Sequence, residues 1–288
     1  MNEEANLKIT TLIENKPSKT DSNLVAEWGL SLHIAFNGHD ILLDTGASGA
    51  FARNAGHLAV DIASIDAAVL SHHHYDHGGG LRQFFELNSK AKVYLGEPPA
   101  GGCFGKAFGF LNKYIGLDKT LTIDYAKRFE TIRQPTEILP DVFIIPRVLC
   151  TNAKPAGNKR LFLKEDHSFT HDDFAHEIIM VIKENGKLAV FTGCSHNGVL
   201  NILDTVTSIF KGVPVKAVIG GFHLVAMPIF NVMAESKRVV RDLARSILEY
   251  PVEVTYTGHC TANKAFGVLK SVMGDRITEI ETGSRFEV

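Results

Sequence analysis

The chain has 288 residues, of which 45% are hydrophobic, and its formal net charge is −2. This length can bury a sizeable core, and the charge balance excludes a general attraction to nucleic acid or anionic membranes. No apolar run reaches the ~18 residues of a membrane-spanning helix, and residues 1–6 lack the pattern of a signal peptide. The four cysteines form no CxxC pair, which favours reduced thiols. We therefore expect a cytoplasmic protein without nucleic-acid or membrane partners.

In the first half of the chain, the sequence predicts three strands, followed by strands that alternate with helices. Alternating apolar residues indicate the first two strands, and Asn37-Gly38 is a hairpin turn signal. The expected strands are 8–13, 30–36, 41–43, 67–70 and 92–95, and the expected helices are 50–58 and 80–87.

The stretch from about residue 96 to residue 130 differs from its surroundings because it is rich in glycine and aromatic residues. An insertion of this size is unusual as a plain connection. It is either a lid or substrate wall, or a surface excursion with its own small apolar cluster.

The second half repeats the alternation of strands and helices. No Pro/Ser-rich linker, charge block or repeat divides the chain, so we expect one domain over residues 1–288. Strands first, then alternating elements in both halves, favour an α+β fold with two sheets sandwiched between helices. The expected strands are 177–183, 188–192, 216–219, 252–256 and 277–280, and the expected helices are 199–209, 235–249 and 262–272.

The segment after the strand at 67–70 reads SHHHYDHGGG. Imidazole suits zinc, manganese and iron, and a nearby aspartate adds an oxygen ligand. His72 and His74, two residues apart at a strand end, can bind one ion from the same side. Asp76 and His77 can face a second ion one short turn later. The spacing predicts a site for one or two divalent metal ions, zinc first among them.

Three further segments also place a histidine just after an apolar strand, namely His196, His223 and His259. Ligands gather at the carboxyl ends of strands in open sheets. We therefore expect all four segments to converge.

These residues resemble a known family. The His-x-His-x-Asp-His motif at 72–77, the upstream segment 41–46 and Gly258-His259 resemble the signature of the metallo-β-lactamase superfamily. The resemblance covers about residues 9–280 and implies the four-layer αβ/βα sandwich. Segments 192–198, 220–224 and 257–261 resemble a narrower group, named for 7,8-dihydropterin-6-ylmethyl-4-(β-D-ribofuranosyl)aminobenzene 5′-phosphate synthase.

The resemblance also implies which residues bind metal. His72 and His74 correspond to ligands of the first ion, and Asp76, His77 and His259 to ligands of the second.

Two positions of the implied ligand set stay open. Cys194 stands where the superfamily often has an aspartate that bridges both ions, so one ion or two can be bound. The third ligand of the first ion is either His196, which we favour slightly, or His176, which lies eighteen residues before Cys194.

Other residues receive weaker roles. Asp44 matches a strand-end aspartate of the superfamily and is expected to orient a ligand histidine rather than to cap the turn before Gly46. His223 is either a contact to a substrate anion or proton donor, or a core histidine. Trp28, Arg147 and Lys154 could line a pocket, but a surface role is the better expectation for each.

The sequence and the resemblance together favour a metal-dependent hydrolase. A bound ion would lower the pKa of water and polarise an ester, phosphoester or amide oxygen, while Asp76 orients the nucleophile. The alternatives are a transferase like the named synthase, which joins an aminobenzoate-derived acceptor to a pterin carbon with loss of diphosphate, and a non-catalytic binding protein. In each case the expected partner is a small, anionic molecule; the oligomeric state is not indicated.

Overall fold

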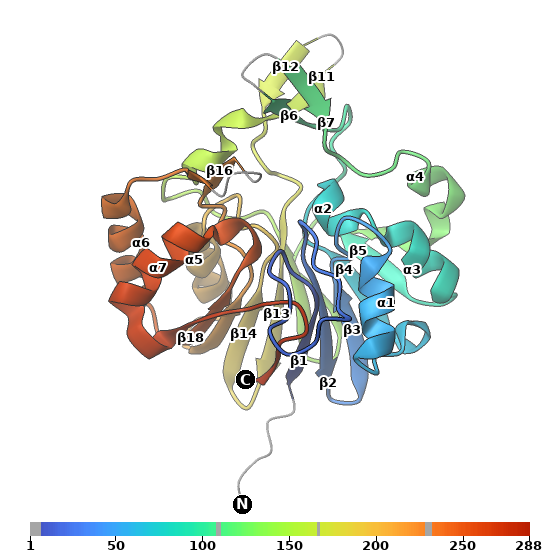
Figure 1. The fold of residues 1–288 in the computed structure, drawn as a ribbon, viewed down its shortest axis with the longest axis horizontal. Coiled ribbons are helices and arrows are strands. Elements are labelled where there is room, and N and C mark those ends of the chain that lie inside the picture. Colours follow the sequence, from blue (N-terminus) through green and yellow to red (C-terminus); the bar gives the residue numbers. More distant parts are fainter. Residues whose placement is uncertain (1–6, 108–110, 166–167, 228–231) are drawn as a thin grey trace, which may run out of the picture.

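Two seven-stranded sheets lie face to face at the centre of the molecule (Figure 1). The computed structural model describes residues 7–107, 111–165, 168–227 and 232–288. The first sheet contains, in spatial order, β20 (Arg285–Glu287), β1 (Lys8–Ile13), β2 (Ser31–Phe36), β3 (His39–Leu43), β4 (Ala67–Leu70), β5 (Lys92–Leu95) and β8 (Phe129–Thr131). The second contains β19 (Ile277–Glu279), β18 (Val252–Thr257), β15 (Val215–Ile219), β14 (Lys187–Phe191), β13 (Ile178–Glu184), β10 (Val142–Pro146) and β9 (Thr136–Leu139).

Helices cover the outer face of each sheet, which completes four layers (Figure 1). On the side of the first sheet lie α1 (Ala50–His57), α2 (Tyr75–Gly78), α3 (Leu81–Leu87) and α4 (Leu121–Asp124). On the side of the second lie α5 (Val199–Ile209), α6 (Lys237–Glu249) and α7 (Asn263–Met273). The predicted αβ/βα sandwich is thus confirmed. Within the described part of the chain, no helix is long and apolar enough to cross a membrane.

The apolar core has three parts because each central strand is buried on both faces. In β14, Leu188 and Val190 pack under the helices of the second sheet, whereas Ala189 and Phe191 face the first sheet. This alternation follows from the two-residue period of a strand. Strands buried on both faces read as continuous apolar runs, which is why the sequence revealed them.

Strand direction places the chemistry-bearing loops at one end of the sandwich. β3, β4 and β5 are parallel in the first sheet, and β14, β15 and β18 are parallel in the second. Their carboxyl ends therefore lie along one edge of each sheet, and the polar loops follow there.

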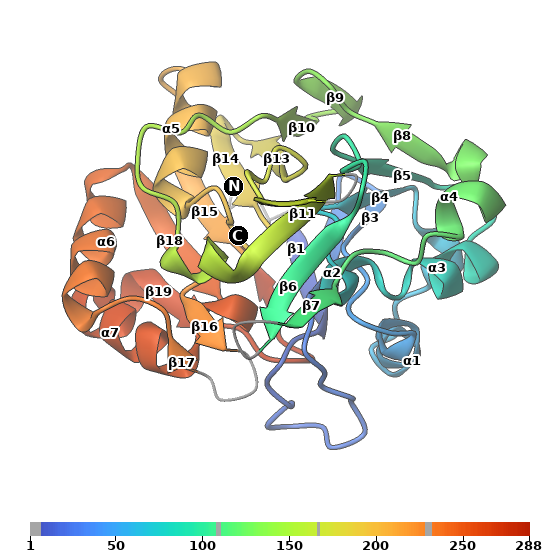
Figure 2. The same cartoon turned by 90° about the horizontal axis from the view of Figure 1, so that it is seen from above.

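The expected insertion at about 96–130 contains strands of its own. β6 (Cys103–Ala107) and β7 (Leu111–Tyr114) pair with each other, and β6 also pairs with β11 (Leu161–Glu165), which pairs with β12 (Ser168–His171). Seen from above, this third sheet lies over the end of the sandwich (Figure 2). Strands β9 to β12 were not predicted from the sequence, because their short segments lack a clear period.

Candidate metal centre

Four loops bring their histidines into ring contact at the open end of the sandwich. They follow β4 in one sheet and β14, β15 and β18 in the other. The ring centroids of His72 and His77 are 4.2 Å apart, those of His77 and His259 are 4.9 Å apart, and those of His196 and His223 are 4.0 Å apart. The structure thus brings together the segments that the sequence predicted to converge.

His72, His74 and His196 form the first ligand group. Their ligand atoms lie within 4.8 Å of one another, and His72 Nε2 is 3.1 Å from His74 Nδ1. Two nitrogens that share a tetrahedral zinc ion are separated by roughly 3.4 Å, given the usual Zn–N distances. The Nε2 atom of His196 is buried without a hydrogen-bond partner among the described residues. Buried polar atoms rarely stay unsatisfied, so this group fits a divalent cation.

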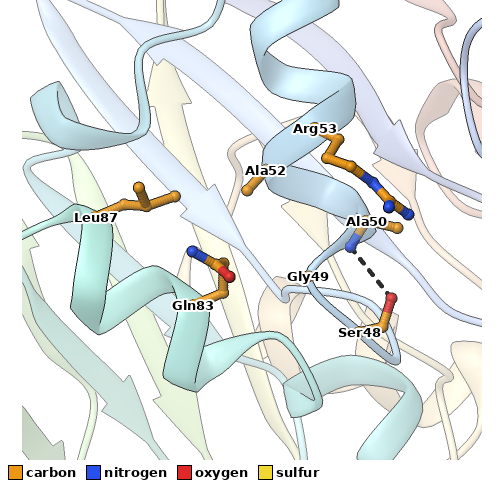
Figure 3. A pocket seen from close by; sticks show the side chains of 7 residues that line it. All are labelled: Ser48, Gly49, Ala50, Ala52, Arg53, Gln83 and Leu87. Carbon is orange, nitrogen blue, oxygen red and sulfur yellow. Dashed lines mark hydrogen bonds between the residues drawn. The ribbon is translucent and has the colours of Figure 1, made fainter.

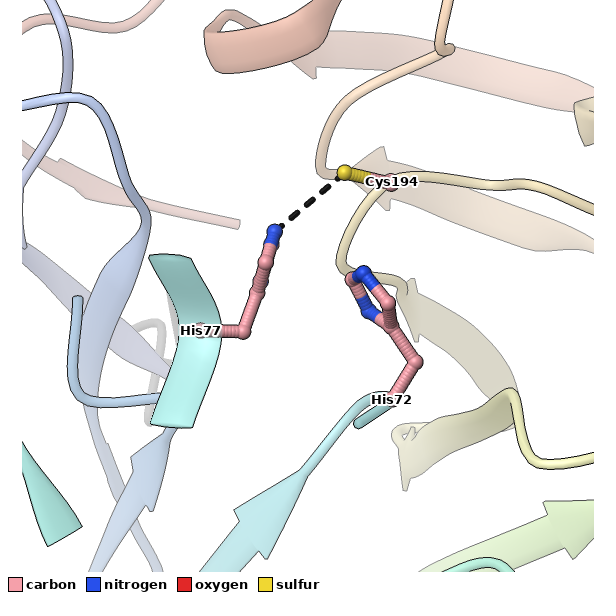
Figure 4. A group of neighbouring side chains, drawn as sticks. All are labelled: His72, His77 and Cys194. Carbon is pink, nitrogen blue, oxygen red and sulfur yellow. Dashed lines mark hydrogen bonds between the residues drawn. The ribbon is translucent and has the colours of Figure 1, made fainter. Parts of the chain in front are cut away.

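Asp76, His77, Cys194 and His259 form the second ligand group. His77 Nε2 lies 3.1 Å from His259 Nε2 and 3.2 Å from Cys194 Sγ. Asp76 Oδ2 lies 3.5 Å from His259 Nε2. Figure 4 shows His77 pointing at the sulfur with His72 beside it, and the ligand atoms of these three residues are within 4.8 Å of one another. Cys194 therefore lies between the two groups, where a bridging residue would stand.

Oxygen acceptors behind four of the rings determine which nitrogen faces the site. Each acceptor lies within 3.0 Å of an Nδ1 atom, so the ring donates its Nδ1–H and its Nε2 keeps a lone pair for an ion. The pairs are Asp44 Oδ2 with His77 (2.6 Å), Ser71 Oγ with His72 (3.0 Å), Asn158 Oδ1 with His196 (2.9 Å) and Asn15 Oδ1 with His259 (3.0 Å).

The orientation of these acceptors is itself fixed. The Ser71 hydroxyl donates to Asp44 at 2.7 Å, so its oxygen is left to accept from the ring. The Asn158 amide nitrogen donates to the His196 carbonyl at 2.7 Å, which turns its oxygen toward the same residue's ring. Metal-ligating histidines have this kind of partner, and Asp44 lies where the expected orienting residue should.

His176, the alternative third ligand of the first ion, lies at the side of the group. Its Nδ1 accepts the backbone N–H of His73 at 3.3 Å, so the neutral ring carries its proton on Nε2. That nitrogen faces Asp172 Oδ2 at 3.1 Å, with Cys103 Sγ at 3.8 Å. A protonated Nε2 has no lone pair for an ion. The geometry favours His196 for this role, and the ligand assignment as a whole stays a prediction.

The pKa values of the rings follow their surroundings. Burial lowers the pKa of His74 to about 3. Burial, followed by the neighbouring imidazoles, lowers the pKa of His196 well below its ordinary value. For His77, burial favours the neutral ring, but the carboxylates of Asp44 and Asp76 outweigh it and raise the pKa to about 9. A cation at His77 therefore competes with a proton, whereas the first group offers neutral imidazoles, the form that binds metal.

Trp28 requires a correction, because a surface role was expected for it. The side chain is half-buried, its indole N–H donates to Asp76 Oδ2 at 2.8 Å, and its ring centroid is 5.0 Å from that of His259. It orients a candidate ligand, and no motif around it could have revealed this. Arg147 is exposed, as expected, and Lys154 donates to the backbone carbonyl of Asp173.

Sequence reasoning also missed three buried or half-buried polar residues. Asn15 follows β1 as the histidines follow their strands, so the strand-end rule could have found it. Glu177 is fully buried and accepts the backbone N–H groups of His196 at 2.6 Å and Asn197 at 2.8 Å. Glu177 and Asn158 come from segments without a recognisable motif.

His223 is half-buried beside His196, and its backbone is held in a left-handed conformation with φ of 47°. Left-handed backbone is uncommon for residues other than glycine and is often found at functional sites. Its Nδ1 is buried without a partner in the part of the chain that the structure describes.

A surface hollow adjoins the second ligand group. This cavity of about 280 Å³ borders the second group and is lined by Trp28, Lys16 and His259, among others. A larger hollow of about 480 Å³ lies between α1 and α3, where Arg53 is the charged lining residue (Figure 3). The larger hollow contains none of the ligand residues, so the smaller cavity is the better candidate for a substrate site beside the ligand groups.

Comparisons with known proteins agree with this fold. A model of the metallo-β-lactamase superfamily matches residues 30–148. Over 277 residues, the chain is 29% identical to a 7,8-dihydropterin-6-methyl-4-(β-D-ribofuranosyl)-aminobenzene-5′-phosphate synthase of Methanocaldococcus jannaschii, which covers 90% of this chain and 89% of the relative. An uncharacterised protein of the same organism is 27% identical, over 76% of this chain and 80% of that protein.

A solved structure has the same architecture over its whole length. It is the crystal structure of a metal-dependent hydrolase of the β-lactamase superfamily, with a TM-score of 0.80 and 26% identity, covering 98% of this chain and 99% of that one. Residues 30–148 therefore match the metallo-β-lactamase superfamily, and the whole chain is similar in sequence and architecture to the proteins named above. In particular, the chain is similar to the synthase group that the segments after β14, β15 and β18 indicated.

Proposed function

We propose that this protein is a metal-dependent hydrolase that acts on an ester, phosphoester or amide bond of a small, anionic molecule. The observation that carries the proposal is the pair of adjacent ligand groups, whose Nε2 lone pairs are oriented toward each other by acceptors behind the rings. A divalent cation bound there would lower the pKa of water and polarise the scissile carbonyl or phosphoryl oxygen.

The chain's own residues divide the remaining work. His72, His74 and His196 would hold the first ion, and His77, His259, Asp76 and Cys194 the second.

Asp76 is suited to orient the nucleophile. Burial disfavours its ionised form, but the neighbouring His77 and His259 outweigh burial and lower its pKa below the usual range. The carboxylate is therefore ionised at neutral pH. The Trp28 indole fixes one of its oxygens at 2.8 Å, so the group can accept a proton from water without reorienting.

His223 is suited to donate a proton to the leaving group. Its ring centroid is 4.0 Å from that of His196, and its Nδ1 has no partner among the described residues. A half-buried imidazole can exchange its proton with solvent and hold it near the reacting bond.

A transferase remains the second candidate because of one specific observation. The relative that is 29% identical over 90% of this chain is named as a synthase. Both candidates need the metal centre, so the reaction must be tested separately from metal binding.

Metal analysis combined with a substrate screen tests the proposal. Protein purified without added metal should contain zinc, manganese or iron, and it should hydrolyse members of an ester and phosphodiester panel. The His72→Ala/His74→Ala variant should lose the tighter ion and the turnover while it keeps its fold. His57→Ala, which removes an exposed histidine at the end of α1, is the matched control.

The outcomes separate the candidates. Unchanged metal content in the double variant would contradict the assignment of the site. Metal binding without hydrolysis, but with diphosphate release from a pterin-type diphosphate and an aminobenzoate-derived acceptor, would replace the hydrolase by the transferase. Metal binding without turnover on either panel would leave a ligand-binding protein.

A further inference from the structure

We infer that Cys260, together with Cys194, binds the second ion, so that this ion has a sulfur-rich ligand set. The inference rests on the proposed metal-dependent function and extends it, because Cys260 follows the ligand His259 and had no expected role. The sulfur atoms of Cys194 and Cys260 and a ring nitrogen of His259 lie within 4.8 Å of one another, and all three residues are buried.

The upper limit of 4.8 Å between these atoms is compatible with one shared ion. Two thiolates on a tetrahedral zinc ion are roughly 3.8 Å apart, and a thiolate and an imidazole nitrogen are roughly 3.6 Å apart, given the usual Zn–S and Zn–N distances. Cys194 Sγ is already 3.2 Å from His77 Nε2. With His259 and with His77, whose Nε2 also lies 3.1 Å from His259 Nε2, the two cysteines would make a Cys₂His₂ set.

The surroundings of Cys260 suit a thiolate. The backbone N–H of His223 donates to Cys260 Sγ at 3.2 Å. Hydrogen bonds from backbone amides to ligand sulfur are among the contacts that tune metal–thiolate sites. A Cβ on Gly221 would lie 2.5 Å from this sulfur, so the glycine leaves the space that Cys260 occupies.

Asp76 offers a carboxylate oxygen beside these sulfurs. Its Oδ2 is shared with the Trp28 indole at 2.8 Å and lies 3.5 Å from His259 Nε2. Thiolate ligands select zinc and other thiophilic ions over magnesium, calcium and manganese. The inference therefore narrows the cofactor of the second site to a thiophilic ion.

Cadmium titration of the full-length, reduced, metal-stripped protein tests the inference, because each cadmium–thiolate bond adds ultraviolet charge-transfer absorption. Cys194→Ser and Cys260→Ser should each lose about half of that absorption, and the double variant should lose nearly all of it. Cys150→Ser is the control, since Cys150 is an exposed thiol whose contacts are to Val148 and Asn197. It should keep the full absorption.

Full absorption in Cys260→Ser would overturn the inference. If that variant does not fold, X-ray absorption at the zinc edge of Cys194→Ser decides instead. Sulfur at ~2.3 Å from zinc should persist there through Cys260, and its absence would contradict the inference. Neither result alters the metal content or the hydrolysis by the unmodified protein, so failure here is distinguishable from failure of the proposed function.

Discussion

Four oxygen atoms behind the histidine rings determine which ring nitrogen can bind an ion. Each fixes an Nδ1–H and so leaves an Nε2 lone pair pointing at the ion, with no tautomer change needed on binding. Asn158 is the clearest example, because its amide contacts both the ring and the carbonyl of His196.

Asn158→Ala should therefore weaken the binding of the first ion without unfolding the protein. Loss of such a partner costs about 10–100-fold in metal affinity. Asn158→Asp keeps an oxygen acceptor for the ring and should restore most of the affinity. Zinc competition with a chromophoric chelator measures both variants. Equal affinity in Asn158→Ala and the parent protein would show that the His196 ring needs no such support.

At the scale of elements, the ends of the central strands are packed too closely for any added atom. Gly193 follows β14, and a Cβ there would lie 2.1 Å from Ser71 Oγ and 3.1 Å from His72 Nδ1. The two sheets meet at this point, so the glycine allows β14 to approach the loop after β4.

Gly193→Ala should therefore destabilise the fold by about 1–3 kcal/mol, as overpacking does, and it should disturb His72. Gly267→Ala is the control, because a Cβ added at this exposed position within α7 would have no atom within 4 Å. It should stabilise the protein by about 0.5–1 kcal/mol. Denaturant unfolding of both variants gives the comparison, and a neutral effect of Gly193→Ala would refute the close approach.

Asp204, on α5, contacts the loop after β10 and the connection from α6 to β18. The Tyr250 hydroxyl donates to it at 2.5 Å and lowers its pKa, and Thr151 donates to it at 2.7 Å and acts in the same direction. A lowered pKa in the folded state means that Asp204 stabilises the protein above its ordinary pKa and loses this effect as the pH falls through the folded value.

The stability difference between the parent protein and Asp204→Asn should therefore be largest near neutral pH and shrink as the pH falls below about 4. Urea unfolding across this range measures it. A difference that does not change with pH would mean that the Asp204 charge plays no part.

At the scale of the whole molecule, the features that the sequence predicted are those that depend on local patterns of residues. The four-layer fold was predicted from the apolar strands and the periodicity of the helices. Most of the candidate ligands were predicted from the histidines at strand ends. The sequence did not predict the sheet of β6, β7, β11 and β12, because its strands are short and β6 pairs with β11 across nearly sixty residues of chain. Nor did it predict Trp28, Asn158 or Glu177, whose roles arise from tertiary contacts.

Every role proposed for these residues depends on two ions that lie side by side. A crystal structure of the zinc-loaded protein, with anomalous diffraction at the zinc edge, is the decisive measurement. We expect one ion at about 2.0–2.1 Å from His72 Nε2, His74 Nδ1 and His196 Nε2, and a second ion on the Nε2 atoms of His77 and His259. An ion bound by His176 with His196 out of reach, or no ion at either group, would refute this arrangement.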